Sequence, residues 1–335
     1  MGCPRLTTEM TIQMNTNFLK LALCACGLVA ATVTAPSAPL QRADVAADPI
    51  WVVHVDCDAL RPIAIGQFLL SELERQEAQA KFAAFQSIFN FDPRKQLHGL
   101  TLYSSGKAPE DGVLLVYADF DPDRLLTMAK AAKDYHGTAY KQHTIHNWID
   151  EKKKARNGVK PRVYAAIQGG HIVVFAQQET RVAQALDVLD RAAPNLAGSG
   201  LFPRLGANGS TGFIQAAARK MDIPETAPNA ALFRLAKSAR LEVGEIQGQL
   251  KATLNLEADD EEVAKQMALV GQGLLALMKL QKDNPGSVKL AEGLALKQDG
   301  AGVVASLAVP TADVIELMKA DAARKAQKKA KAEND

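Results

Sequence analysis

The chain has 335 residues, of which 47% are hydrophobic and 5% aromatic, and its formal net charge is +2. This composition is typical of a globular protein, and the length allows two domains of ordinary size. The nearly neutral charge argues against a nucleic-acid-binding protein, and the few aromatic rings leave little surface for stacking bases.

Residues 1–47 are predicted to be an export signal. Lys20 precedes the uncharged apolar run LALCACGLVAATVTA (21–35), and small residues follow this run, as in secretory signal peptides. The run is shorter than the roughly 20 apolar residues that a membrane-spanning helix needs. We therefore expect an exported chain, periplasmic or extracellular, with no stable membrane span after cleavage of the signal.

The processing of this segment has alternatives. Small residues precede three cleavage points, after Ala35, Ala38 and Ala47, and the sequence VAA favours the last of them. A lipid-anchored form through Cys26 is a second route, because LCAC (23–26) weakly resembles a lipoprotein box. Met14 opens a better signal peptide than the first residue does, so residues 1–13 are a candidate for a mis-assigned start.

A pattern of two strands, a polar cap and an apolar-striped helix recurs along the rest of the chain. It occurs four times, at 111–131, 169–189, 247–270 and 299–320. The order of these occurrences predicts two tandem modules, at 48–192 and 211–323. A linker rich in Gly, Pro and Asn would join them at 193–210. Residues 324–335 are basic and are expected to form a disordered or helical tail.

The strands are predicted to pair in antiparallel sheets with one buried face. In QLKATLNLEA (249–258), apolar and polar residues alternate with a period of two. Helices are expected to cover the apolar face, and one of them carries a stripe made of Ala78, Phe82, Phe85 and Phe89. The predicted fold class is α+β, with two tandem copies of an antiparallel-sheet module and helices packed on one face.

Acidic residues at alternate positions, Asp119, Asp121 and Asp123, suggest the beginning of a calcium-binding loop. Such a loop needs Gly at its sixth position and Glu at its twelfth, where this chain has Arg124 and Lys130. Helix capping explains the same residues, because Asp121 precedes Pro122, a residue suited to the first helical position. Alignment of the second module makes Asp259 the corresponding cap.

Cys57 is the only cysteine beyond the predicted signal, so no internal disulfide is expected. As a nucleophile it would need a histidine as base. His54 lies on the same strand but points to the opposite face, which leaves His143 or His171. The simpler interpretation is a buried thiol, with one of the two neighbouring aspartates, Asp56 or Asp58, capping the next helix.

We expect no metal and no cofactor. His143 and His146 lie in a predicted strand, where side chains three positions apart diverge, and no third ligand is apparent. The basic run DEKKKARNGVKPR (150–162) is interpreted as a hairpin tip with a turn at Asn157–Gly158. A contact with an anionic partner is the alternative for this run.

The chain resembles a group of exported bacterial proteins of unknown function that are built from tandem α+β repeats. The residues that carry the resemblance are WVVHVD (51–56), LTLYSS (100–105), DGVLLVYADFD (111–121) and ALDVLD (185–190). The resemblance implies fold and location, and it supplies no catalytic residue.

Two hypotheses on function follow. The favoured one is a non-enzymatic envelope protein that binds or scaffolds another envelope protein or a polymer. The alternative is an exported enzyme with a site between the modules, using Cys57 and a histidine.

Overall fold

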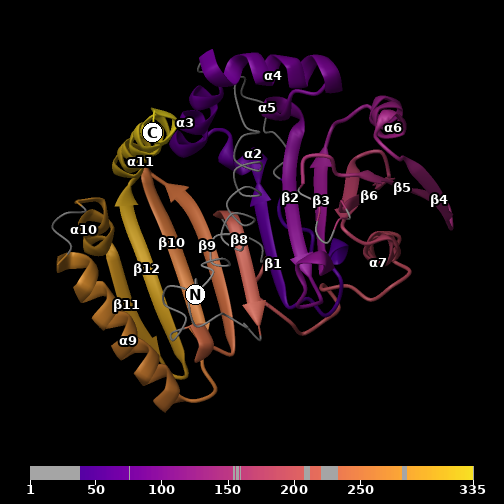
Figure 1. Ribbon diagram of the computed structural model, residues 1–335. Coiled ribbons are helices and arrows are strands. Elements are labelled where there is room, and N and C mark those ends of the chain that lie inside the picture. The colour runs from indigo at the N-terminus through magenta and orange to yellow at the C-terminus, as the bar shows by residue number, and fades with distance from the viewer. Residues whose placement is uncertain are drawn as a thin grey trace, which may run out of the picture.

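The computed structural model describes residues 38–74, 76–153, 155, 158, 160–206, 212–219, 233–280 and 285–334. Within these ranges the strands form a single twelve-stranded sheet in which the paired strands are antiparallel (Figure 1). Helices pack against the sheet, so the predicted α+β class is confirmed. No helix in the described part of the chain is both long and apolar enough to cross a membrane.

The first half of the chain contributes seven strands to the sheet. Its elements in chain order are η1 (Arg42–Asp44), β1 (Trp51–Asp56), α2 (Cys57–Leu60), α3 (Ala64–Leu73), α4 (Gln76–Phe89), α5 (Pro93–Gln96), β2 (Leu97–Ser104), η2 (Pro109–Asp111), β3 (Gly112–Ala118), α6 (Pro122–Ala131), β4 (His136–Tyr140), β5 (His143–Ile149), β6 (Arg162–Gln168), β7 (Ile172–Ala176) and α7 (Glu179–Leu189).

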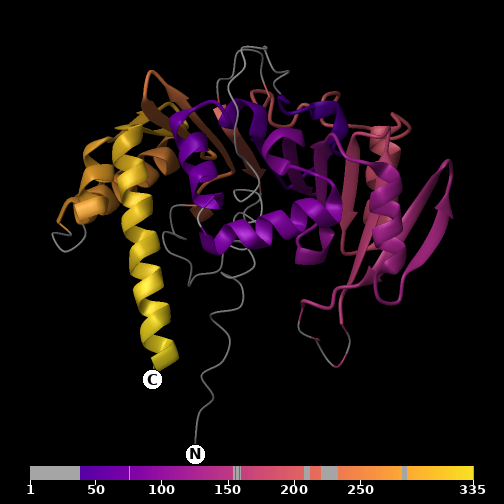
Figure 2. The same ribbon diagram turned by 90° about the horizontal axis from the view of Figure 1, so that it is seen from above.

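The second half contributes the other five strands. Its elements are β8 (Gly212–Arg219), β9 (Ser238–Ile246), β10 (Gln249–Glu257), α9 (Glu261–Leu280), α10 (Pro285–Glu292), β11 (Leu294–Asp299), β12 (Gly302–Pro310) and α11 (Thr311–Asn334). Residues 324–334 of the predicted tail thus continue the last helix, which projects away from the sheet in Figure 2.

The expectation of two separate sheets is wrong, because β1 and β8 pair with each other and join the halves. Trp51 lies opposite Ala218 and Val55 lies opposite Ile214 in this antiparallel pair. The strand order is β11-β12-β10-β9-β8-β1-β2-β3-β7-β6-β5-β4. Counted outward from the β1–β8 pair, β8-β9-β10-β12-β11 follows the same order as β1-β2-β3-β7-β6. The first half adds the hairpin β4–β5 at the outer edge (Figure 1).

Helices cover both faces of the first half, where helices on one face were predicted. Side chains of β3 alternate between the two faces. Val113 and Leu115 pack with α7 in one buried cluster, whereas Val116 packs in another cluster with residues of α2 and α3. In the second half α9 packs on one face, and the opposite face carries polar residues of β10 such as Lys251 and Glu257. The predicted one-sided arrangement therefore describes the second half better than the first.

Residues 38–47 belong to the packed structure, although the predicted boundary of the signal segment lies at residue 47. Leu40 and Val45 are buried in the same cluster as α7. Arg42 donates hydrogen bonds to the carbonyl oxygens of four residues between β7 and β8: Leu196, Leu201, Phe202 and Leu205. The segment 193–206, predicted as a linker between modules, is consequently fixed against the first half.

The aromatic stripe of α4 does not form the predicted cover of the sheet. This helix lies at the upper end of β2 and β3 in Figure 1. Of its described members, Phe85 is 37% exposed, whereas Phe82 and Phe89 are half-buried. Phe82 lies under the guanidinium of Arg94, 4.8 Å from its carbon to the ring centroid. The side chain of Ala78 lies outside the described residues.

Candidate functional site

The weak catalytic candidates Cys57, His54 and His143 do not come together in one site. Cys57 is fully buried in a cluster with Val55 and Leu60, where a substrate has no access. His54 is buried too, and both of its ring nitrogens are engaged. Nδ1 lies 2.9 Å from Thr101 Oγ1, and Nε2 lies 2.9 Å from the carbonyl oxygen of Ala38.

Two other histidines were considered as the base: His143 lies far from β1, and His171 lies in solvent. His143 is on β5, five strands from β1 in the sheet order, which is about 24 Å at the usual strand spacing. Its Nε2 lies 2.7 Å from Asp190 Oδ2. The side chain of His171 is 78% exposed, in the turn before β7. Asp56 caps α2 by accepting a hydrogen bond from the Ala59 N–H at 2.8 Å. Of the two predicted caps, Asp56 and Asp58, the first is therefore the one that the structure uses.

The acidic stretch begins a helix. Asp121 is the N-cap of α6 and accepts hydrogen bonds from the backbone N–H groups of Asp123 and Arg124, each at 3.1 Å. In the second half the cap of α9 is Asp260, which accepts from the Val263 N–H at 2.8 Å. The prediction of Asp259 was therefore displaced by one residue. In the described ranges no three His, Cys, Asp or Glu side chains are grouped so as to hold a metal ion.

Asp119 has a partner that the sequence does not reveal. Its Oδ2 lies 3.0 Å from Nε2 of His98, at the beginning of β2, and Nδ1 of His98 lies 3.0 Å from Oδ2 of Asp58. Asp58 is buried and also pairs with Arg61 at 2.7 Å. Burial lowers the pKa of His98, but the hydrogen bonds and charges of Asp119 and Asp58 outweigh it, so the pKa is raised. His98 was missed because only strand pairing brings these three side chains together.

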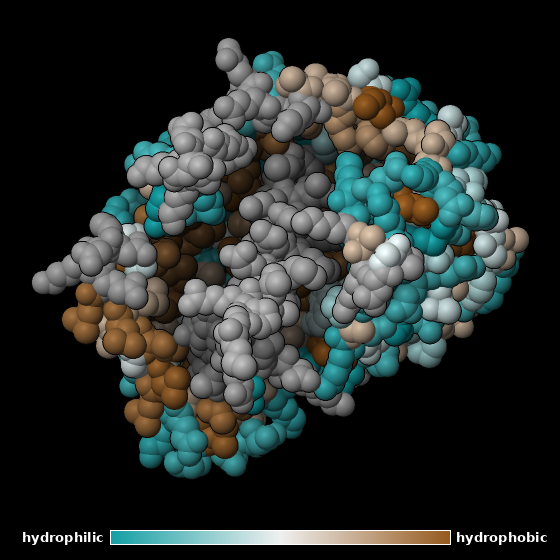
Figure 3. All heavy atoms as spheres, in the orientation of Figure 1, coloured by the Kyte–Doolittle hydropathy of each residue, from teal (hydrophilic) through white to brown (hydrophobic). Residues whose placement is uncertain are grey.

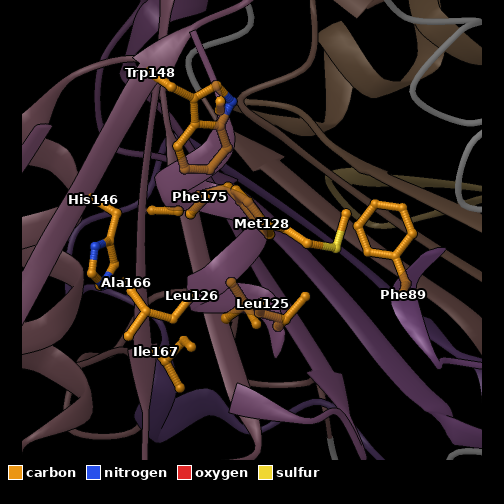
Figure 4. A pocket seen from close by; sticks show the side chains of 13 residues that line it. Phe89, Leu125, Leu126, Met128, His146, Trp148, Ala166, Ile167 and Phe175 are labelled. Carbon is orange, nitrogen blue, oxygen red and sulfur yellow. The ribbon is translucent and has the colours of Figure 1, made fainter. Parts of the chain in front are cut away.

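An apolar cavity of about 320 Å³ lies between α6 and the sheet. Its walls come from α4, α6, β5, β6 and β7, and its lining includes Phe89, Leu125, Met128, Trp148 and Phe175. In Figure 4, His146 and Trp148 lie on one side of this hollow, and Phe89 lies on the opposite side. Nothing in the sequence pattern indicates the cavity, because most of its lining consists of apolar residues of the kind found on any amphipathic helix or strand.

The cavity exists because α6 stands away from the sheet. The helix carries apolar residues such as Leu125, Leu126 and Met128, yet none of its side chains is buried. Core helices normally interlock with the sheet beneath them at the density of organic crystals. Arg124 holds the helix from the side, by donating to the carbonyl oxygens of Ser87 and Ile88 at the end of α4.

Two polar groups face this apolar space. The ring of His146 stacks on Tyr135, whose hydroxyl lies 2.9 Å from Nδ1. Burial, followed by the charge of Lys130, lowers the pKa of His146, so the imidazole is neutral at pH 7. Among the described residues, neither His146 Nε2 nor the indole N–H of Trp148 has a hydrogen-bond partner. His143 and His146 point to opposite faces of β5, as predicted for a strand.

A second apolar hollow, of about 360 Å³, lies on the same face of the sheet near the β1–β8 pair. Trp51, Val53 and Leu241 line it together with small residues of β8. Strand residues alone line it within the described part of the chain, so no described helix lies over this hollow. The cavity under α6 is therefore the stronger candidate for a specific site.

No protein-family model and no curated protein matches the chain. Three crystal forms of TP0453 are similar in structure, and all of them cover 84% of this chain. Form III has a TM-score of 0.49 at 8% identity and is covered over 98% of its length. Form I has a TM-score of 0.46 at 10% identity and 98% coverage, and form IV has 0.45 at 9% and 97%. Similarity at this level establishes neither a family nor a function.

Proposed function

We propose that this protein is a non-enzymatic binding protein of the bacterial envelope that holds a small amphiphilic molecule in the cavity under α6. The observation that carries the proposal is the cavity itself. Its volume, about 320 Å³, falls within the range of small-molecule sites, which are mostly apolar with a few polar groups that orient the ligand.

The ligand would be an amphiphile with one hydrogen-bonding end. Leucine, methionine and phenylalanine side chains from α4, α6 and β7 would surround its apolar part. The indole N–H of Trp148 would donate to an acceptor at the polar end, and His146 Nε2 offers a second contact. Filling the space would also restore to the half-buried residues of α6 the packing contacts that they lack.

The proposed location in the envelope is supported by the signal-like composition of residues 21–35. Cleavage after Ala35 fits the fold better than cleavage after Ala47, because Leu40, Arg42 and Val45 hold the segment 193–206 in place. The partner of the loaded protein would be another envelope component. An enzymatic role through Cys57 has no support from its fully buried position.

The test uses the tryptophans, of which the chain has two, Trp51 and Trp148. In a Trp51→Phe protein, emission reports the cavity alone. Titration with decanol, decanoate and decane should shift the Trp148 emission and show saturation, with decanol or decanoate binding more tightly than decane.

A matched pair of substitutions separates the cavity from the surface. Ala129→Leu places a larger side chain into the cavity and should abolish the saturable response. Ala131→Leu adds the same side chain at an exposed position of the same helix and should leave it unchanged. A response that is absent, or equal in both variants, would overturn the proposal.

A further inference from the structure

The segment leading into α6 is fastened through few contacts to the last residue of α5, Gln96, and to His98 at the beginning of β2. The Asp119 N–H donates to the carbonyl oxygen of Gln96, and Gln96 Nε2 donates to the carbonyl oxygen of Asp119, both at 2.9 Å. The side chain of Asp119 adds the contact with His98 at 3.0 Å. Two residues later Asp121 caps α6, so this segment positions the N-terminal end of the helix that covers the cavity.

The charged groups around His98 come from three places in the fold. Asp58 approaches Nδ1 from α2, with Arg61 at 2.7 Å on the far side of its carboxylate. Asp119 approaches Nε2 from the segment between β3 and α6. His171, in the turn before β7, lies 4.0 Å from the other oxygen of Asp119 and is 78% exposed. His98 is thus held between two carboxylates, of which one is buried and the other is mostly in solvent.

Protonation decides how many of these contacts His98 can make. The imidazolium donates from both ring nitrogens, whereas neutral imidazole has one N–H. When the proton leaves, the remaining N–H stays with Asp58, since a buried carboxylate that loses a donor is penalised more than an exposed one. Nε2 then presents a lone pair to the carboxylate of Asp119, which is 60% exposed and can turn to water.

We propose that the His98–Asp119 contact is a pH-operated latch on α6: protonated His98 keeps the helix closed over the cavity, and deprotonation loosens it. The direction follows from the pKa of His98, which lies above its ordinary value of 6.5. The latch is complete below pH 6.5 and is lost as the pH rises through the raised pKa. A ligand would therefore enter and leave the cavity faster on the alkaline side. The latch would control ligand entry only if the proposed binding function holds, so this inference rests on that function. Its test, however, needs no ligand.

The test measures the access of acrylamide to Trp148 in the Trp51→Phe protein, without ligand, between pH 5.5 and 8.5. The quenching constant should rise with pH by at most about fivefold, the size expected for a half-exposed ion pair. His98→Gln and Asp119→Ala should both give the high value at the acidic end. His171→Gln, which removes the other histidine near Asp119, should retain the wild-type profile.

His146 also titrates beside Trp148, so the decisive quantity is the difference between the wild-type and His98→Gln profiles. His98→Gln keeps His146, and any contribution of His146 cancels in that difference. Identical profiles for the two proteins would overturn the latch. Quenching that follows His98 while no amphiphile binds would instead leave the latch standing and refute the binding function.

Discussion

The side chain of Arg42 makes an unusually large number of hydrogen bonds to the backbone. Its guanidinium donates to four backbone carbonyls that lie 154 to 163 residues away in the sequence. Together with the Leu196 N–H bond to the carbonyl oxygen of Val45, these contacts fix residues 193–206, which are rich in Gly and Pro. Because carbonyls in such a loop have no partners in a sheet or helix, one planar five-donor group substitutes for regular secondary structure.

Replacement of Arg42 by Ala is expected to lower the free energy of unfolding by roughly 2–4 kcal/mol, since several part-buried carbonyls lose a charged donor. Arg42→Lys should recover only part of this loss, because an ammonium group cannot reach the four oxygens as a planar fork. Urea denaturation of the two variants and the wild type measures both effects. Equal stability of the Ala and wild-type proteins would contradict the assigned role.

His54 should make the protein less stable in acid. Burial lowers the pKa of His54, and this outweighs the raising effects of the Ala38 carbonyl and Asp56. Above the ordinary value of 6.5 the imidazole is neutral in both folded and unfolded chains. As the pH falls from 6.5 toward the lowered pKa, the unfolded chain takes up a proton that the folded chain does not. Stability should then fall by at most ~1.4 kcal/mol per pH unit.

The check is a series of urea midpoints between pH 7.5 and 5 for the wild type and His54→Gln. The difference between the two proteins should shrink as the pH falls, since only the wild type carries this linkage. His98 acts in the opposite direction, above pH 6.5, so a His98→Gln series identifies its separate share. A difference that stays constant with pH would refute the assignment to His54.

At the scale of the helices and strands, local chemistry was informative where neighbours in the sequence decide the outcome. The cap at Asp121, the strand at His143–Ile149 and the alternation in Gln249–Glu257 depend on adjacent residues, and the sequence predicted all three. The stripe on α4 failed as a predictor of burial. A helical stripe shows that one face is apolar but does not state what lies against it, and none of the described stripe residues is fully buried.

The candidate site could not be predicted from the sequence for a related reason. Its lining residues come from α4, α6 and three strands, and most of them are apolar residues of the kind that any amphipathic segment carries. The cavity arises because α6 does not pack closely against the sheet, and such packing is decided by the tertiary structure. His98, Asp58 and Asp119 are likewise assembled by the pairing of β1, β2 and β3.

Helix α9 offers a direct comparison of two glycines on one element. A Cβ at Gly273 would have no neighbour within 4 Å, whereas one at Gly271 would lie 2.9 Å from Cδ2 of Leu296. Gly273→Ala should therefore stabilise the protein by about 0.5–1 kcal/mol, the usual helix preference of Ala over Gly. Gly271→Ala should gain less, because the Leu296 side chain must move. Denaturation midpoints for the two variants give the ranking, and a larger gain at Gly271 would contradict it.

Apolar residues remain exposed along the same helix. Leu269, Leu277 and Leu280 are 59%, 60% and 71% exposed, and Figure 3 shows hydrophobic residues gathered at the lower left, where α9 lies in Figure 1. These side chains contribute little to the free energy of folding, because most of their surface stays in water. The stability of α9 depends instead on Ala264, Met267 and Ala268, which face the sheet.

On the scale of the whole molecule, the two halves are bound into one folding unit. The β1–β8 pair makes the sheet continuous, and one buried cluster contains Val55 and Leu60 of the first half with Leu250 and Val309 of the second. The matched strand orders are compatible with an internal repeat, and superposition of residues 51–189 on 212–323 remains the direct test of it. A repeat whose copies share a core should not unfold in two steps.

Trp51 and Trp148 allow that cooperativity to be measured. Trp51 lies on β1 at the junction of the halves, and Trp148 lies on β5 near the outer edge of the sheet. In Trp148→Phe and Trp51→Phe proteins, each carrying one tryptophan, the urea transitions should coincide with each other and with the loss of circular dichroism. Both probes would then report one all-or-none transition, because loss of the first half removes Val55 and Leu60 from the core that the second half needs. An earlier transition at Trp148 would show that the outer strands of the first half unfold separately, and it would contradict a single all-or-none transition.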